Sequence, residues 1–162
     1  MRFAAAVAAA LALAAPAAAA PPPAGVLVPG RSLGGIELGT TKAQVEKRWG
    51  RAYGRCRNCT AETWYFNYFA FQPRGAGVEL RDGRVVGVFT LYQPPGWRTT
   101  RGLELGEPEA RVVALYPKLV RIGCEGYAVL RLAGIGVTTA LYIVDGRLWA
   151  FGLFRPDLPV CR

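Results

Sequence analysis

Two segments of the chain alternate apolar and polar positions on both sides of an Asp-Gly pair. They are "VELRDGRVVGVFTLY" at 78–92 and "GVTTALYIVDGRLWAFGLF" at 136–154. Asp-Gly flanked by such alternation is a strong short-range signal for a β-hairpin. Aromatic and β-branched residues also dominate the segments ahead of the hairpins, "ETWYFNYFAF" at 62–71 and "YAVLRLA" at 127–133. Each half of the chain is therefore predicted to supply three strands.

A short helix is predicted ahead of each set of strands. Thr41 followed by Gln44 has the spacing of a capping box, and Pro108 stands where a first helical residue belongs. Gly50 and Pro117 are expected to end the two helices. Helices of about two to three turns are marginal alone, so they are expected to pack against the sheet.

The two halves also share short sequences in the same order. The pentapeptide "GIELG" at 35–39 returns as "GLELG" at 102–106, and the tripeptide "DGR" at 82–84 returns at 145–147. Self-similarity in a fixed order is typical of two copies of one structural unit. The prediction is an α+β fold of two tandem helix-plus-three-strand units. Their short helices pack on an antiparallel sheet that the units either share or build separately.

The predicted organisation has five parts. Residues 1–20 form a signal peptide, and residues 21–32 form a proline-rich, extended and mobile lead-in. Residues 33–92 form the first unit, and residues 102–162 form the second unit with a disulfide-tied tail. The linker between them, residues 93–101, contains two prolines and a glycine, which favour an irregular connection.

The N-terminus has the pattern of a secretory signal peptide. Arg2 precedes an apolar run from Phe3 to Ala20 that Pro16 interrupts, and the small residues at 17–20 offer a cleavage site. The alternative is an uncleaved anchor, because the run approaches the roughly 18 residues that span a bilayer. The expected location is secreted or extracytoplasmic, with a membrane contact only if this segment stays uncleaved.

Four cysteines in an exported chain favour disulfides over a metal site. Of the three ways of pairing them, we expect Cys56 with Cys59 and Cys124 with Cys161, because the second bridge ties the C-terminal tail to the domain. A zinc site would need a second pair of closely spaced cysteines. Thiol-redox chemistry at "CRNC" would need a helix that starts at the first cysteine. A structural disulfide is therefore preferred, and no metal is expected.

The composition excludes several kinds of active site. The chain has no histidine and one serine, Ser32, which removes Ser-His-Asp and Cys-His catalytic groups. Its glycines do not have the spacing of a phosphate-binding loop. We therefore expect a protein that is not an enzyme, with no catalytic residues and no cofactor.

Aromatic residues of the second hairpin are candidate binding residues. With Asp145 and Gly146 at the turn, alternation places Tyr142, Trp149 and Phe151 on one face. The first hairpin has smaller or charged residues at the equivalent positions. A similar aromatic set shares one face of segment 62–71: Trp64, Phe66 and Tyr68. Either these rings form a recognition surface, or the C-terminal tail or the other unit covers them as core.

Several features occur in both halves over residues 33–154: a helix start after glycine, a valine four residues further on, a cysteine and an aromatic hairpin. The best segment is "ELGTTKAQV" at 37–45, and the second copy, "LGEPEARV", has proline in place of the helix-start threonine. This pattern resembles the secreted β-lactamase inhibitory proteins, and each unit is similar to outer-membrane assembly lipoproteins of the SmpA/OmlA/BamE type. The resemblance implies a helical layer on an antiparallel sheet whose concave face binds a protein. It carries over no inhibitor contact residue.

The expected function is that of a secreted, non-enzymatic binding domain that recognises a protein through an aromatic sheet face. The alternative is a basic, aromatic binder of cell-wall polymer or nucleic acid, since the net charge of +9 attracts polyanions. The arginines are scattered singly along the chain, with no run of them, which weakens this alternative. A thiol-redox protein that uses the CxxC motif is the third candidate.

Overall fold

The computed structural model describes residues 25–69 and 72–162, and the expected signal peptide at 1–20 lies outside them. In the described residues the elements have these bounds in chain order: β1 (Val26–Val28), β2 (Ser32–Leu33), β3 (Ile36–Glu37), α1 (Lys42–Trp49), β4 (Gly54–Arg55), β5 (Glu62–Phe69), β6 (Gln72–Arg81), β7 (Arg84–Leu91), β8 (Arg98–Thr99), α2 (Glu109–Leu115), β9 (Val120–Cys124), β10 (Tyr127–Gly134), β11 (Val137–Val144) and β12 (Arg147–Phe154).

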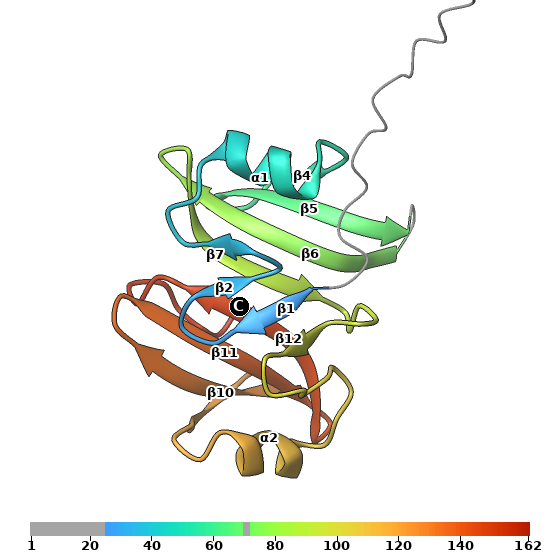
Figure 1. Ribbon diagram of the computed structural model, residues 1–162, viewed down its shortest axis with the longest axis vertical. Helices are drawn as coiled ribbons and strands as arrows, with labels where there is room; N and C mark the ends of the chain where they lie inside the picture. The colour runs from blue at the N-terminus through green and yellow to red at the C-terminus, as the bar shows by residue number, and fades with distance from the viewer. Residues whose placement is uncertain (1–24, 70–71) are drawn as a thin grey trace, which may run out of the picture.

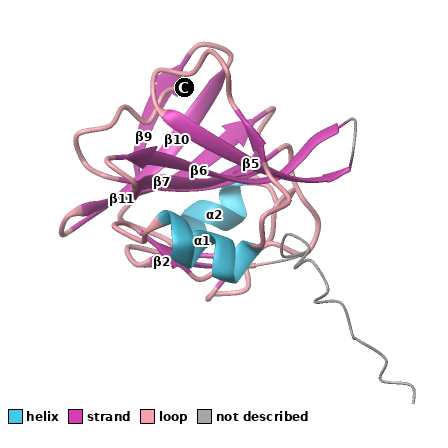
Figure 2. Cartoon of the chain, turned by 90° about the horizontal axis from the view of Figure 1, so that it is seen from above, coloured by secondary structure: helices cyan, strands magenta, loops and turns pink. Residues whose placement is uncertain are grey.

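The main layer is an eight-stranded antiparallel sheet in the order β4-β5-β6-β7-β12-β11-β10-β9. A small second sheet has the order β3-β2-β1-β8. The two helices and β2 lie on one side of the large sheet, whereas the C-terminus lies on its other side (Figures 1 and 2). Among the described residues, no helix is long and apolar enough to cross a membrane.

The predicted α+β class is wrong, because the protein is mostly β. In the described part of the chain the two helices have 8 and 7 residues, and twelve strands in two sheets form most of the regular structure. Each half also gives the large sheet four strands rather than three, because β4 and β9 pair alongside β5 and β10. The six additional strands are two to five residues long, too short for alternation to reveal them.

The expected mobile lead-in and the expected linker contribute regular structure. Val26–Val28 is strand β1, which pairs with β2 on one side and with β8, from the expected linker, on the other. Leu27 in β1 and Trp97 just before β8 are buried. Prolines near both segments suggested irregular chain, but proline is tolerated beside a short strand. Both segments are therefore part of the layer that covers the large sheet.

An aromatic core joins the helical side to the large sheet. The Trp49 ring, at the end of α1, packs edge-on against two other rings. Its centroid lies 5.2 Å from that of Phe66 on β5 and 6.3 Å from that of Trp97. Its indole N–H donates a hydrogen bond to the Gly34 carbonyl at 2.9 Å. The buried nitrogen is therefore paired, as tryptophan in a core requires.

The repeated pentapeptides end in the same backbone contact. Gly39 and Gly106 have φ values of 82° and 94°, which glycine adopts readily and other residues do not. The Arg84 guanidinium donates to the Gly39 carbonyl, and the Arg147 guanidinium donates to the Gly106 carbonyl, both at 3.0 Å. Each pentapeptide is thereby attached to the first residue of a sheet strand, β7 or β12. These two strands adjoin at the centre of the large sheet.

Candidate binding face

The face of the large sheet that points away from the helices is the candidate site, and we call it the open face. A cavity of about 500 Å³, named here the aromatic groove, lies on this face. Strands from both halves border it, because β7 and β12 are neighbours in the sheet. The rings that line it are those of Tyr65, Phe89, Tyr92, Tyr127, Tyr142, Trp149 and Phe154.

Glycines make room for the two phenylalanine rings of the groove. A Cβ atom at Gly77 would come within 2.7 Å of the Phe89 ring, and one at Gly152 within 2.3 Å of the Phe154 ring. Because both glycines lack that atom, the rings lie directly against the sheet. Phe89 and Phe154 are stacked, with centroids 6.3 Å apart and planes 22° apart. The groove therefore has a closely packed aromatic floor.

Gly152→Ala is expected to lower the free energy of unfolding by about 1–3 kcal/mol, because the new methyl group overlaps the Phe154 ring. Chemical denaturation of the variant measures the loss. The matched control is Gly123→Ala in β9, where a Cβ atom would meet nothing within 4 Å. Equal stabilities of the two variants would contradict this account of the floor.

A β-bulge decides which residues of β12 reach the groove. Regular alternation from the turn predicts that Tyr142 pairs with Trp149. In the structure Tyr142 pairs with Ala150 instead. Trp149 is the extra residue of the bulge, so the side chains after it exchange faces. Phe151 is therefore buried in the main core, and its predicted place on the binding face is wrong. Tyr142 and Trp149 do line the groove, as half-buried side chains.

Trp64 and Phe66 also lie in the core rather than on the open face. Their exposed fractions are 1% and 0%. The ring of Tyr53 stacks on that of Trp64, with the two centroids 4.1 Å apart. The side chain of Tyr68, the third candidate on this strand, lies outside the described part of the structure. Alternation directs Tyr65, which stands between the two core rings, into the groove instead.

Five rings of the groove were missed by the sequence interpretation: Tyr65, Phe89, Tyr92, Tyr127 and Phe154. Tyr65 could have been found, because it alternates with two residues that the pattern assigned to one face. Tyr92 lies beyond the end of β7 with φ 53°, a conformation that alternation does not predict. The pairing of β7 with β12 brings the two sets of rings together, and it joins segments about 60 residues apart that have no local signal for each other.

The C-terminal tail, residues 155–162, borders the groove. Val160 packs against the small apolar cluster on the open face. The Tyr142 hydroxyl donates a hydrogen bond to the Val160 carbonyl at 3.0 Å. Cys161 is bridged to Cys124 on β9, as predicted. The tail therefore covers one part of the open face and leaves the groove beside it.

Arg162 and Glu79 form an ion pair where the tail meets the groove. The Glu79 side chain, on β6, is 12% exposed and that of Arg162 is 29% exposed. The Arg162 guanidinium also lies 4.3 Å from the centroid of the Phe154 ring, within cation–π range. A carboxylate that is mostly buried needs such a partner. The tail thus neutralises the charge of Glu79 at the groove wall.

Burial affects the ionisation of two tyrosines that line the groove. Burial raises the pKa of Tyr142 far above its ordinary value of 10.0, and it raises the pKa of Tyr65 as well. Both phenols therefore stay protonated near neutral pH. They place neutral phenol groups beside apolar rings, and that of Tyr142 is held by the Val160 carbonyl.

Tyr142 is expected to stay protonated until the chain unfolds in alkali. The unfolded chain releases this proton near its ordinary pKa of 10.0, whereas the folded protein retains it. The contribution to stability is complete below pH 10 and is lost as the pH rises above it. Ultraviolet titration should therefore count equal numbers of phenolates in wild type and Tyr142→Phe before alkaline unfolding. A lower count in the variant would show that Tyr142 ionises in the folded protein.

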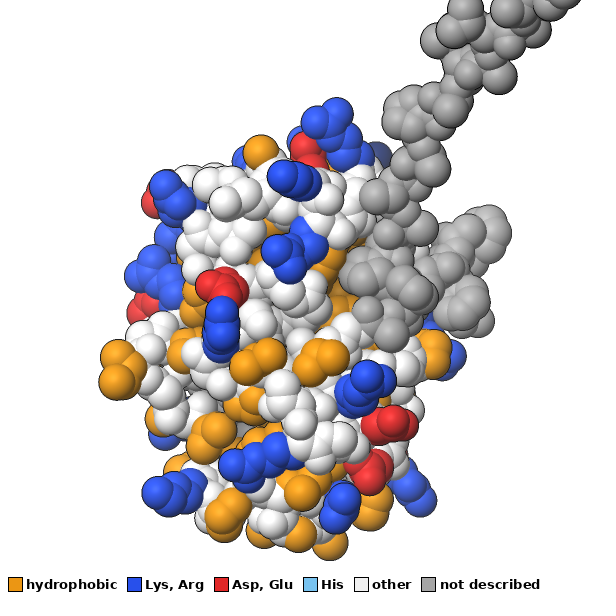
Figure 3. Space-filling model, in the orientation of Figure 1, with side chains coloured by type: hydrophobic (Ala, Val, Ile, Leu, Met, Phe, Trp, Pro, Cys, Tyr) orange, Lys and Arg blue, Asp and Glu red, His pale blue; other side chains and the backbone are white. Residues whose placement is uncertain are grey.

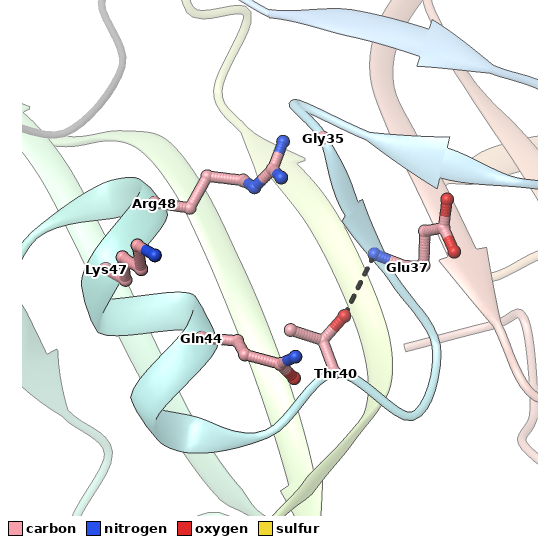
Figure 4. A pocket seen from close by; sticks show the side chains of 6 residues that line it. All are labelled: Gly35, Glu37, Thr40, Gln44, Lys47 and Arg48. Atoms are coloured by element: carbon pink, nitrogen blue, oxygen red, sulfur yellow. Dashed lines mark hydrogen bonds between the residues drawn. The ribbon is translucent and has the colours of Figure 1, made fainter.

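A second cavity, of about 590 Å³, lies between α1 and β3, and we call it the polar cleft (Figure 4). Gln44, Lys47 and Arg48 line it from α1. On the opposite wall the Glu37 amide donates to the Thr40 hydroxyl at 3.3 Å. Its charged side chains are exposed, and the residues that line it include no ring to anchor a ligand. The aromatic groove is the stronger candidate.

The CxxC motif forms a disulfide between Cys56 and Cys59, as predicted. Both cysteines lie in the loop between β4 and β5, and in the described chain the nearest helix, α1, ends before them. A reactive thiol of this motif usually stands at a helix N-terminus, which lowers its pKa. The arrangement favours a structural bridge over thiol-redox chemistry.

Basic side chains do not gather into one patch on the face that Figure 3 draws. Figure 3 shows Lys and Arg side chains separated by neutral and apolar ones on the face that carries the helices. Several arginines also pair with carboxylates, including Arg31 with Glu37 and Arg121 with Glu109. A polyanion-binding surface would instead gather basic groups into one stripe or patch.

No family model and no curated protein sequence matches this chain. Among solved structures, its fold is similar to that of an extracellular protein containing an SCP domain from Bacillus anthracis str. Ames, with a TM-score of 0.51 and 11% sequence identity. The alignment covers 74% of this chain and 44% of the other, so the chain spans less than half the length of that protein. At this identity the likeness shows the fold alone. The two disulfides are consistent with a location outside the cytoplasm.

Proposed function

We propose that this protein is a secreted binding module without enzymatic activity, which recognises a protein partner through the aromatic groove. The observation that carries the proposal is the concentration of seven rings around one cavity on the open face. Tyrosine and tryptophan are the commonest anchors of protein recognition surfaces, because each combines a large apolar area with a polar group. Tyr92 and Trp149 are side chains of this kind, and the centroids of their rings are 6.2 Å apart.

The groove is also prepared for binding before a partner arrives. Its floor rings are fixed against glycines, and the Tyr142 hydroxyl is fixed by the tail. Rings that are already ordered lose little conformational entropy when a partner binds. Tyr92 is 50% exposed and thus offers apolar area that a partner can bury.

The chemistry of the groove supports binding rather than catalysis. Tyr65 and Tyr142, whose pKa values burial raises, are neutral, and Glu79 is paired with Arg162. A general base would need a carboxylate or another group that is free to accept a proton. The proposal also keeps the expectation, from the resemblance to β-lactamase inhibitory proteins, that one face of the sheet binds a protein.

Affinity capture tests the proposal. Immobilised wild-type protein should retain one protein from the medium or envelope of the producing cells through a high-salt wash. Tyr92→Ala should lose it, whereas Arg48→Ala, at the polar cleft, should retain it. Capture that depends on low salt and extends to polyanions would instead support the polymer-binding alternative. Retention of the partner by Tyr92→Ala and Trp149→Ala alike would contradict a role for the groove.

A further inference from the structure

The tail shows what kind of molecule the open face accepts. Residues 158–162 form no strand or helix in the described structure, so they contact the sheet as an irregular linear segment. Leu158 and Val160 place apolar side chains on the cluster that includes Phe154. This part of the face thus binds a peptide segment without extending the sheet.

Tyrosine hydroxyls bind the backbone of this segment. Tyr142 donates to the Val160 carbonyl at 3.0 Å, and Tyr127 donates to a main-chain carboxylate oxygen of Arg162, the last residue, at 2.8 Å. The Tyr127 hydroxyl also accepts a hydrogen bond from the Arg162 amide at 2.6 Å. Because every residue has a carbonyl, and all except proline an amide, these contacts suit many sequences. The apolar side chains then provide the selectivity.

The aromatic groove continues the surface that the tail occupies. Phe154 lies under Arg162 of the tail and also lines the groove. Beyond it the groove presents the rings of Phe89 and Trp149 and the phenol groups of Tyr65 and Tyr92. A further cavity of about 550 Å³ lies past the Glu79–Arg162 pair and shares Tyr65 with the groove. The groove and this cavity thus lie next to each other on the open face, with the Glu79–Arg162 pair between them.

We infer that the aromatic groove binds a linear, non-helical peptide segment of the partner protein, as a continuation of the tail. An apolar side chain of that segment packs on Phe89, between Tyr65 and Trp149, and its backbone carbonyls accept hydrogen bonds from tyrosine hydroxyls. The net charge of +9 favours a neutral or acidic segment. The inference rests on the proposed function and adds the form of the partner's contact.

A library of random linear peptides, panned against the full-length oxidised protein, tests this inference. Selected peptides should share an aliphatic or aromatic residue and should not be rich in lysine or arginine. Fluorescence titration should show that Phe89→Leu lowers the affinity of the protein for one such peptide at least about tenfold. Trp149→Ala should lower this affinity by a similar factor. Arg48→Ala at the polar cleft should bind it as wild type does. Thermal melting confirms that each variant is folded.

The outcomes separate the two proposals. No enrichment above background, or peptides whose affinity is the same for wild type, Phe89→Leu and Trp149→Ala, overturns the peptide-groove inference. If the captured folded partner still requires Trp149 in that case, the proposed function stands and its contact is not a linear segment. Selected peptides that compete with the captured partner support both.

Discussion

Phe151→Ala is expected to lower the free energy of unfolding by about 3–5 kcal/mol, because it empties a large buried site in the main core. Trp149→Ala, two residues away on the same strand, is expected to cost about 1 kcal/mol, because the indole is half-buried at the groove. The contrast follows from the bulge, which turns the two rings to different faces of the sheet.

Denaturant unfolding of the two variants, beside wild type, measures this contrast. The smaller change at the larger side chain is the informative result, since side-chain size alone would predict the reverse order. Equal or greater destabilisation by Trp149→Ala would mean that the indole belongs to the core, and the groove would then lose its principal anchor.

The second large effect is expected from the bridge that ties down the tail. The double variant Cys124→Ser/Cys161→Ser opens a link across a sequence separation of 37 residues, and chain entropy predicts a loss of about 4 kcal/mol. The control Cys56→Ser/Cys59→Ser opens a link across 3 residues and should cost about 2 kcal/mol.

A second readout distinguishes the two bridges. Without the Cys124–Cys161 bridge, the tail can leave the apolar cluster that it covers, so binding of a hydrophobic dye should rise in the folded variant. The other double variant should bind no more dye than wild type. Mass mapping of the wild-type protein should first find no free thiol. A folded Cys124→Ser/Cys161→Ser protein with full stability and no added dye binding would show that the bridge does not hold the tail.

Local signals in the sequence predicted local structure well. The capping box of Thr41 and Gln44 begins α1, and Gly50 follows its last residue. The Asp145-Gly146 turn pairs Ile143 with Leu148, as its geometry requires. These features depend on residues within a few positions of each other, so a short stretch of sequence determines them.

Features that interrupt a regular pattern, or that depend on distant parts of the chain, were not predicted, with the Cys124–Cys161 bridge as the exception. Alternation cannot reveal the bulge at Trp149, because an extra residue interrupts the period of two on which alternation depends. The strands β1 and β8 are three and two residues long, and they are formed by pairing with each other across about 70 residues. The contact of Arg162 with Glu79 and Phe154 is equally non-local. The aromatic groove depends on the bulge and on the contacts of Arg162, which explains why sequence alone found only part of it.

The affinity of the captured partner for Trp149→Ala tests the central claim most directly. Calorimetric or optical titration should show binding weaker than wild type by at least about 2 kcal/mol, or about 30-fold, as truncation of an anchor residue does. The same preparation should melt close to the wild-type temperature. An unchanged affinity in a folded Trp149→Ala protein would contradict the claim that the aromatic groove is the recognition surface.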